Sequence, residues 1–283
     1  MRKKISYSLK QAEFYDLHPS FTPWPDILVE SGLSLSYRPK EIYWKKLLDF
    51  LEIKKGSILL DAGCGRGIYL RRMVKEYGIY GVGTDISTES INYAKSRWRN
   101  EKLKFIVSDV CKLDFKDNRF DFIVSMDLFE HLVDKTKAMK ELVRVLKPGG
   151  KILIHAVNRN YNYTLDWVWE NLGFDIFKRA SHNPKYFIEI DDIKKDLRNL
   201  NLDIIKVSFY DSFFTLGMDE FIITMALIFQ KLGLGENKIF GKFFLAFWSL
   251  VSKFIYKILL YLDYLWLRNG LSAGVSIVVE KNS

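Results

Sequence analysis

The sequence predicts an α/β fold built on a doubly wound, mostly parallel sheet. From Ser57 to Tyr210 short apolar runs alternate with helical patterns, and each run is apolar throughout. Strands of that kind are buried on both faces, as in a parallel sheet between two layers of helices. A glycine-rich loop follows the first run, at the position where open sheets of this class bind their ligands.

The expected elements follow from the pattern in chain order. Residues 37–53 predict a helix after Pro39, and a later helix begins at a cap formed by Ser87 or Thr88. Another helix ends at the Lys147-Pro148-Gly149-Gly150 turn. The expected strands are residues 57–61, 79–85, 104–109, 120–126, 151–157, 203–210 and 274–281.

The connection before the last strand is the main departure from a plain sheet. Residues 212–270 are dense in Phe, Leu, Ile and Trp, and these 59 residues far exceed an ordinary loop. We therefore expect four segments: an N-terminal helical lead-in and substrate cap (1–55), an α/β core (56–211), an amphipathic helical insertion (212–270) and the final core strand (271–283).

Composition narrows the function classes. The net charge of +9 indicates an anionic partner, such as a lipid surface, a nucleic acid or an acidic substrate, and 48% apolar residues exclude a disordered tail. Cys64 and Cys111 have neither a disulfide framework nor metal-ligand spacing, which fits a reducing cytoplasm. The basic N-terminus lacks the apolar stretch of a signal peptide, so none is expected.

The stretch LLDAGCGRG places an acid beside the glycine loop. Gly63, Gly65 and Gly67 form a G-x-G-x-G pattern, and Asp61 stands two residues before the first glycine. A carboxylate there would repel a pyrophosphate, which disfavours a nicotinamide dinucleotide. It suits a cofactor that brings a cation to the loop, such as the ammonium of a methionine moiety.

Two further acids are expected at the ends of the next strands. Asp85 ends the second strand, where a carboxylate can accept from both ribose hydroxyls. Asp109 ends the third strand and is placed to accept from an adenine amine. Both residues have a simpler alternative as caps of the helices that follow.

Five motifs in this order resemble the class I S-adenosylmethionine-dependent methyltransferases: LLDAGCGRG, GTDIS, VSDV, FDFIVSMDLFEHL and LKPGGKILI. The resemblance covers about residues 38–210 and the last strand. It implies a seven-stranded Rossmann-like sheet with an antiparallel last strand, and S-adenosylmethionine as cofactor. We expect Cys64, Ile86, Val110 and Met126 to lie at the cofactor. Arg38 resembles an arginine that binds the methionine carboxylate, with a solvated helix-start arginine as the alternative.

Methyl transfer to oxygen or nitrogen also requires loss of a proton, so a base helps. The catalytic candidates are His131 after the fourth strand, His155 at the end of the fifth, and His182 in a loop expected to overhang the substrate. Packing roles stay open for these histidines. Asp127, Glu130 and His131 resemble the Glu-x-x-Glu-His string with which quinone O-methyltransferases can hold a divalent cation, and the metal requirement stays open.

The insertion over residues 212–270 indicates what kind of molecule accepts the methyl group. Its longest apolar run has nine residues, too few to span a bilayer. If residues 238–268 form a helix, four lysines fall on one face, and Phe, Trp, Ile and Leu side chains, including Phe247 and Trp248, fall on the opposite face. This pattern is typical of a helix that lies in a membrane interface. The lysines are Lys238, Lys242, Lys253 and Lys257. A lid over the substrate and a dimer interface are the alternatives.

The sequence therefore predicts a cytoplasmic methyltransferase at the inner face of the membrane, acting on a lipid-like or lipid-linked small molecule. A quinone precursor is the leading candidate. One alternative is methylation of a soluble small molecule or glycan sugar under a lid, and another is a non-catalytic S-adenosylmethionine-binding scaffold. A nucleic-acid substrate is disfavoured because the chain has no N-P-P-Y-type base-flipping motif. The methylated atom and the oligomeric state stay open.

Overall fold

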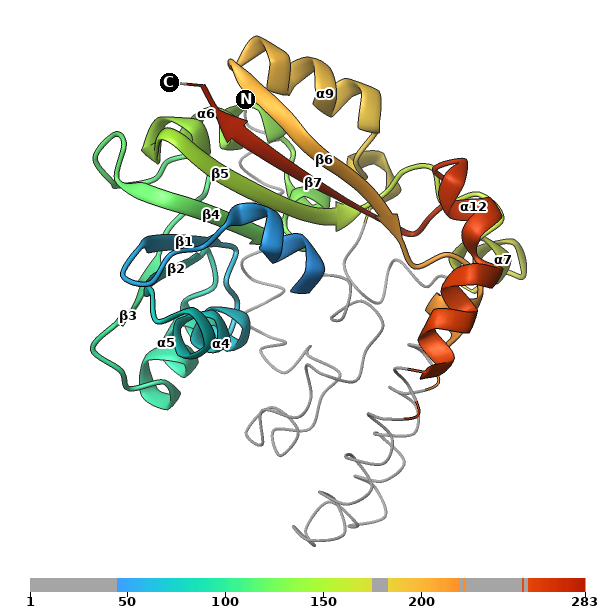
Figure 1. The fold of residues 1–283 in the computed structure, drawn as a ribbon, viewed down its shortest axis with the longest axis horizontal. Helices are drawn as coiled ribbons and strands as arrows, with labels where there is room; N and C mark the ends of the chain where they lie inside the picture. Colours follow the sequence, from blue (N-terminus) through green and yellow to red (C-terminus); the bar gives the residue numbers. More distant parts are fainter. Residues whose placement is uncertain (1–44, 175–182, 219–220, 222–250, 252–253, 283) are drawn as a thin grey trace, which may run out of the picture.

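The computed structural model describes residues 45–174, 183–218, 221, 251 and 254–282. These residues form one seven-stranded sheet in the order β3-β2-β1-β4-β5-β7-β6 (Figure 1). Every pairing is parallel except those of β7, which runs antiparallel to both β5 and β6. The strands are β1 (Ile58–Ala62), β2 (Tyr80–Asp85), β3 (Leu103–Val107), β4 (Phe120–Met126), β5 (Leu146–Val157), β6 (Leu202–Tyr210) and β7 (Gly274–Lys281). The predicted fold class and the antiparallel last strand are confirmed.

Helices cover both faces of this sheet, as a doubly wound fold requires. One apolar cluster joins α6 and α9 to one face, and a second joins α4, α5 and the segment that ends in η2 to the other. The helices are α4 (Ile68–Tyr77), α5 (Thr88–Arg97), α6 (Lys135–Val145), α7 (Leu165–Asn171), α9 (Ile190–Asn199) and α12 (Tyr264–Arg268). Short 3-10 turns are η2 (Asp49–Leu51), η3 (Phe129–His131) and η4 (Pro184–Tyr186).

Two predicted boundaries need correction. The third strand ends at Val107, so Asp109 lies beyond it in a turn. The fifth strand begins at Leu146 directly after α6, five residues earlier than predicted. Leu146 pairs with Phe120 and Lys151 with Phe122, so residues 147–150 lie in an irregular part of this pairing. Gly149 has a φ of +70°, and the pairing of β4 with β5 shifts register between Phe120 and Phe122. Ser87, rather than Thr88, caps α5.

The described end of the insertion forms a helical arm beside α7. Residues 254–262 are helical and lead into α12, which lies next to α7 in Figure 1. No helix among the described residues is long and apolar enough to cross a membrane. Residues 238–250, 252 and 253 of the predicted amphipathic stretch lie outside the described residues. This applies to Lys238, Lys242, Lys253, Phe247 and Trp248.

Candidate functional site

The glycine loop connects β1 to α4 and contains backbone conformations that suit glycine. Gly63 and Gly67 have φ angles of +79° and +73°, in the left-handed region. Gly67 also leaves no room for a side chain, because a Cβ there would lie 2.4 Å from the Phe105 ring. The Gly63 N–H donates to the Thr84 carbonyl at 2.8 Å. The loop is therefore held against the end of β2 and against β3.

Asp85, the last residue of β2, holds the same loop with its side chain. Its Oδ2 accepts from the Gly65 N–H at 2.8 Å, and its Oδ1 accepts from the Ser87 N–H at 2.9 Å. A carboxylate oxygen has two lone pairs, so an oxygen that accepts one N–H can also accept a second donor. The contact with ribose hydroxyls stays a prediction, and the structure adds a positioning role in the loop.

Asp61 lies beneath the loop with 2% of its surface exposed. Burial, and secondly the charge of Asp85, raise the pKa of its carboxyl to about 7. Burial and the same two carboxylates also raise the pKa of the neighbouring Cys64 thiol. Among the described residues no cation pairs with Asp61. Because a buried carboxylate is stabilised by a nearby positive charge, the site fits a ligand that brings its own ammonium.

The side chains expected around the rest of the cofactor lie at the same edge of the sheet. Val110 and Met126 are buried in the apolar clusters, and Ile86 is half-buried after β2. Asp109 is exposed, and its Oδ1 accepts from the Cys111 N–H at 2.8 Å. It therefore caps the turn after β3, and its predicted contact with adenine stays a prediction.

The two described candidate histidines have different surroundings. His155 is completely buried in β5, with Nδ1 2.6 Å from the Ser276 Oγ on β7. Its ring stacks on Tyr210, with centroids 3.9 Å apart. This is the packing role that the sequence left open. His131 ends η3 and is half-buried just beyond the carboxyl end of β4. Of this pair, His131 has the better position for a base.

The metal role of Asp127, Glu130 and His131 stays a prediction. Within the described part of the chain, no group of three His, Cys, Asp or Glu side chains could hold a metal ion. Asp127 is exposed with a φ of +50°, whereas Glu130 is fully buried. The two acids therefore lie in different environments. Arg38 and His182 lie outside the described residues.

Sequence reasoning missed Lys135, which begins α6 close to η3. Its ammonium donates to the Leu132 carbonyl at 3.0 Å and lies 5.5 Å from the centre of the Tyr186 ring. Burial lowers the pKa of Lys135 to about 8, while Glu130 opposes and Arg159 reinforces this change. A lysine in the first turn of an amphipathic helix looks like a solvated residue in the sequence, so no signal marked it.

Comparison with known proteins agrees with this geometry. Residues 60–154 match the family model of a methyltransferase domain. The chain is 33% identical over 120 residues to phosphoethanolamine N-methyltransferase 2 of Caenorhabditis elegans, which is 41% of this chain and 28% of that protein. It is 30% identical over 142 residues to a ubiquinone biosynthesis O-methyltransferase of Coxiella burnetii, which is 49% of this chain and 60% of that protein. The matches thus span less than two thirds of either relative.

A solved structure extends the likeness in fold beyond the matched motifs. Geranyl diphosphate C-methyltransferase from Streptomyces coelicolor A3(2), solved with Mg²⁺, geranyl diphosphate and S-adenosyl-L-homocysteine, superposes with a TM-score of 0.57. The superposition covers 86% of this chain and 79% of that one, at 18% identity. The shared fold therefore reaches well outside residues 60–154.

Proposed function

We propose that this chain, a class I S-adenosylmethionine-dependent methyltransferase by fold, motif order and family match, methylates a lipid-like or lipid-linked small molecule at a membrane surface. When bound, S-adenosylmethionine supplies an activated methyl group together with its leaving group. The observation that carries the cofactor part of the proposal is the buried Asp61 beside Asp85 under the glycine loop, with no described cation to balance Asp61.

The chain's own residues would bind and orient the reactants. Asp61 offers negative charge to the ammonium of the cofactor, and Asp85 fixes the loop and would accept from the ribose hydroxyls. His131, at the carboxyl end of β4, is the proposed base for an acceptor that loses a proton. Lys135 adds positive charge beside η3. The methylated atom depends on the acceptor.

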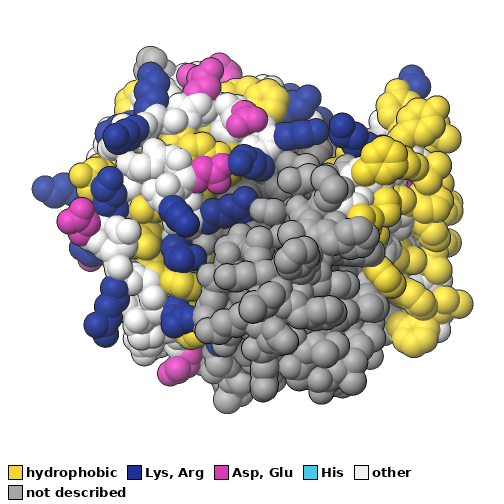
Figure 2. Space-filling model, turned by 60° about the horizontal axis from the view of Figure 1, so that its bottom comes forward, with side chains coloured by type: hydrophobic (Ala, Val, Ile, Leu, Met, Phe, Trp, Pro, Cys, Tyr) yellow, Lys and Arg dark blue, Asp and Glu magenta, His cyan; other side chains and the backbone are white. Residues whose placement is uncertain are grey.

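An apolar helix face supports the membrane part of the proposal. We define it by five exposed side chains on residues 254–268: Phe254, Ile258, Tyr261, Leu262 and Leu265. Their exposed fractions are 71, 48, 80, 42 and 64%. The spacing of three or four residues places them on one side of the helix, while Tyr256 and Asp263 are buried on the other. Figure 2 shows the apolar side chains gathered along one edge of the molecule.

The charges on this arm also favour an anionic lipid surface. The described charged side chains that are exposed on residues 254–268 are Lys257 and Arg268, both cationic. A helix with exposed aromatic and aliphatic side chains and nearby cations suits the boundary between headgroups and acyl chains. The described part of the arm leaves these five apolar side chains exposed, which favours a surface role over a lid that packs the same face on the site. A quinone precursor stays our leading acceptor.

Methyl transfer is tested with S-adenosylmethionine carrying a labelled methyl group. The full chain is incubated separately with a lipid extract, a polar small-molecule extract and a short-chain catechol precursor of a quinone. We expect label in the lipid extract and in the catechol. Label only in the polar extract would favour the soluble-acceptor alternative, and cofactor binding without any transfer would favour the scaffold.

Membrane binding is tested by sedimentation with phosphatidylcholine vesicles, with and without phosphatidylglycerol. Changing Phe254, Tyr261 and Leu265 together to Ser should weaken binding to both kinds of vesicle, because each buried side chain contributes about 1.5–3 kcal/mol. Lys257→Gln should weaken only binding to anionic vesicles, by roughly fivefold at low salt. Ile205→Ser, at an exposed apolar residue of β6, is the matched control. Wild-type protein that stays in the supernatant would contradict the membrane proposal.

A further inference from the structure

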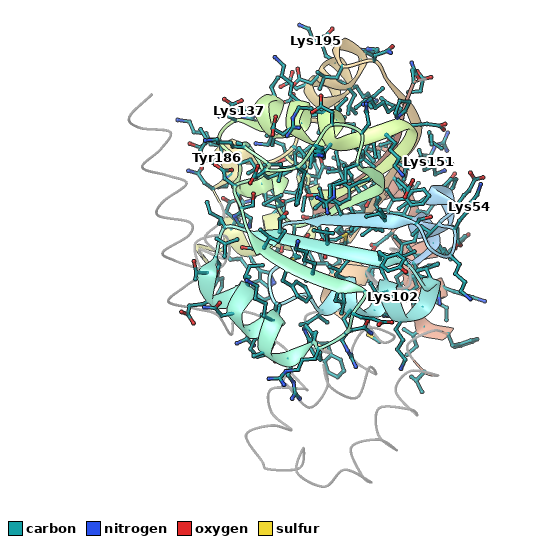
Figure 3. All side chains as sticks on the ribbon, turned by 90° about the vertical axis from the view of Figure 1, so that its left-hand side faces the viewer. Lys54, Lys102, Lys137, Lys151, Tyr186 and Lys195 are labelled. Atoms are coloured by element: carbon teal, nitrogen blue, oxygen red, sulfur yellow. The ribbon has the colours of Figure 1, made fainter. Side chains whose placement is uncertain are left out.

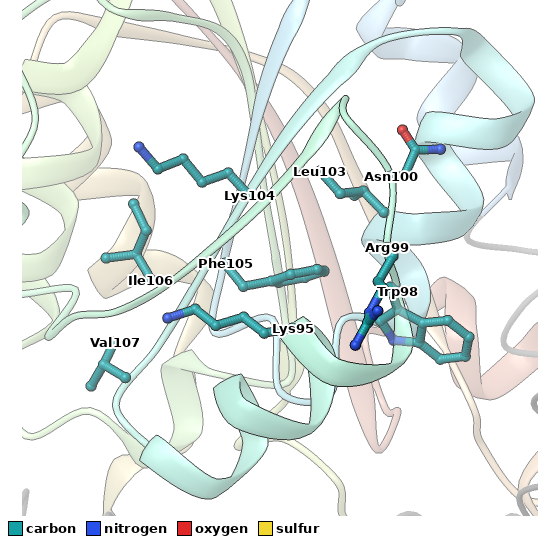
Figure 4. Close-up of a pocket in the computed structure, with 9 residues that line it drawn as sticks. All are labelled: Lys95, Trp98, Arg99, Asn100, Leu103, Lys104, Phe105, Ile106 and Val107. Carbon is teal, nitrogen blue, oxygen red and sulfur yellow. The ribbon is translucent and has the colours of Figure 1, made fainter.

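We infer that the β3 edge of the sheet is a docking site for an extended, acidic segment of a partner protein. A groove of about 720 Å³ runs along this edge, between β3 and the end of α5 (Figure 4). It lies away from the carboxyl ends of β4 and β5, where the acceptor is expected. The inference stands apart from the proposed methyl acceptor and does not depend on it.

The backbone of β3 offers hydrogen-bonding groups on its outer side. β3 pairs with β2 alone, at the end of the strand order, and Figure 3 looks onto this edge. The Lys102 carbonyl and the Ser108 N–H both bond to β2. Because backbone groups alternate sides along a strand, Phe105 and Val107 turn theirs outward. In the described part of the chain no hydrogen bond reaches those outward groups. An added strand would pair with them.

The side chains of the groove define the charge of its occupant. Lys95, Arg99 and Lys104 line it and are exposed, and none of the described residues that line it is acidic. Figure 4 shows that the cations come from both walls, Lys104 from β3 and the other two from α5 and the turn after it. Val107 is 44% exposed and Phe105 forms a buried floor. Successive side chains of a strand point to opposite faces, so Lys104 lies on one face of β3 and Phe105 and Val107 on the other. An extended acidic peptide complements the cations of this lining in charge.

The groove's tryptophan argues for a peptide over a single-stranded nucleic acid. Trp98 is only 8% exposed, its Nε1 donates to the Arg66 carbonyl at 2.7 Å, and the Arg71 guanidinium lies 4.5 Å from its ring centre. It therefore has no open face on which a base could stack, and stacking provides much of the affinity for single strands. A concave groove is also a poor match for a flat lipid surface.

An occupant of this edge would lie close to the cofactor loop. The floor residue Phe105 fills the space that a side chain at Gly67 would need, and a Cβ at Gly83 would lie 2.9 Å from the same ring. Binding along β3 therefore adds contacts to the strand that supports the glycine loop. We expect the docked segment to steady that loop and to raise cofactor affinity.

The test uses a fluorescein-labelled, end-blocked peptide of alternating Glu and Val and measures its anisotropy with the full chain. We expect saturable binding, and slower hydrogen exchange at the amides of Phe105 and Val107 when the peptide is bound. Changing Lys95 and Lys104 together to Glu should weaken binding roughly tenfold or more. The same reversal at the exposed Lys75 and Lys140, on α4 and α6, is the matched control and should have little effect.

Two further reagents separate strand addition from plain charge attraction. Val107→Pro removes one outward N–H but no bond to β2, so it should abolish binding without changing the melting temperature much. A peptide N-methylated at alternate residues keeps its charge but loses a pairing edge, and it should bind at least roughly tenfold more weakly. The inference is overturned if a Lys-Val peptide binds equally well, if the amides of β3 are not protected, or if an oligonucleotide or anionic vesicle displaces the peptide from the groove.

Discussion

Asp85 joins the glycine loop to α5, because each of its carboxylate oxygens accepts a backbone N–H. Asp85→Ala should lower the affinity for S-adenosylhomocysteine roughly ten- to a hundredfold, since a hydrogen bond to a charged group contributes about 1.5–3 kcal/mol. Asp85→Asn keeps one acceptor and should lose less. Calorimetric titration measures both, with Asp114→Ala as a surface control. Unchanged affinity in a folded Asp85→Ala variant would remove this residue from the site.

The buried Asp61 predicts a pH dependence of the cofactor-free protein. Its folded-state pKa of about 7 lies above the ordinary value near 3.9 for an unfolded chain. Folding therefore favours the protonated form, and this contribution to stability is full below about pH 4 and lost as the pH rises to about 7. The free energy of unfolding should fall over that window by up to about 4 kcal/mol. Asp61→Asn should flatten the slope in urea titrations at several pH values.

Cofactor binding should reverse the preference of Asp61 for its proton. An ammonium beside the carboxyl favours the charged form, so binding near neutral pH should release a proton, and affinity should rise between roughly pH 6 and 8. Calorimetry in two buffers with different ionisation enthalpies counts the protons released. Asp61→Asn should release none and bind more weakly above pH 7. A wild-type protein that releases no proton would show that the ammonium lies elsewhere.

At the scale of elements, one buried carboxylate joins the helical arm to the residues after β6. Asp263 accepts from the backbone N–H groups of Phe213, Phe214 and Thr215 at 3.2, 2.9 and 2.9 Å. It also accepts from the Thr215 hydroxyl at 2.6 Å. The arm that carries the apolar helix face is therefore fixed to the core through polar bonds at its buried side.

Removing this carboxylate should release the arm. Asp263→Ala leaves buried donors without an acceptor, which we expect to lower the free energy of unfolding by about 3–5 kcal/mol. Thr215→Val keeps the Asp263 carboxylate but removes the hydroxyl's bond to it and the bond that the hydroxyl accepts from the Ser212 N–H, and should cost about 2 kcal/mol. Hydrogen exchange at the amides of residues 213–215 should become faster in Asp263→Ala than in Thr215→Val. Equal exchange in the two variants would mean that apolar packing, and not Asp263, holds the arm.

The strands were predictable because each is an apolar run bounded by polar or glycine residues, as in 120–126, where predicted and observed bounds agree. The start of β5 was not predictable, since Pro148 and Gly149 are typical of a turn, and only the pairing of Leu146 with Phe120 places the strand's first residue in the sheet. In the candidate site, Asp61 could be singled out from the sequence, because a carboxylate beside the glycine loop would repel a cofactor that carries phosphate there. A packing role for His155 was among the expectations, but its partners Ser276 and Tyr210 were not predictable, because they come from strands distant in sequence.

At the scale of the whole molecule, the sheet depends on β7. It pairs with β5 on one side and β6 on the other, and Val275, Ile277, Val278 and Val279 are completely buried. At about 1.5–3 kcal/mol for each side chain, their burial is comparable to the whole stability of a typical domain, about 5–15 kcal/mol. β6 has no other partner in the described sheet.

Deleting residues 271–283 should therefore abolish cooperative unfolding rather than only lower the melting temperature. We expect a broad thermal transition by circular dichroism and exposed apolar surface that binds a fluorescent dye. A synthetic peptide of residues 271–283 added to the shortened chain should restore part of the transition. A sharp transition in the shortened chain alone would contradict this expectation.

The central position of β7 also has a consequence for the order of synthesis. Of the seven strands it is the last to leave the ribosome, yet it lies between two that were made earlier. While the ribosome makes the residues after Tyr210, β5 presents an open edge and β6 has no neighbour. The nascent chain therefore passes through a period of exposed strand edges, in which a chaperone is needed more than at any time after release.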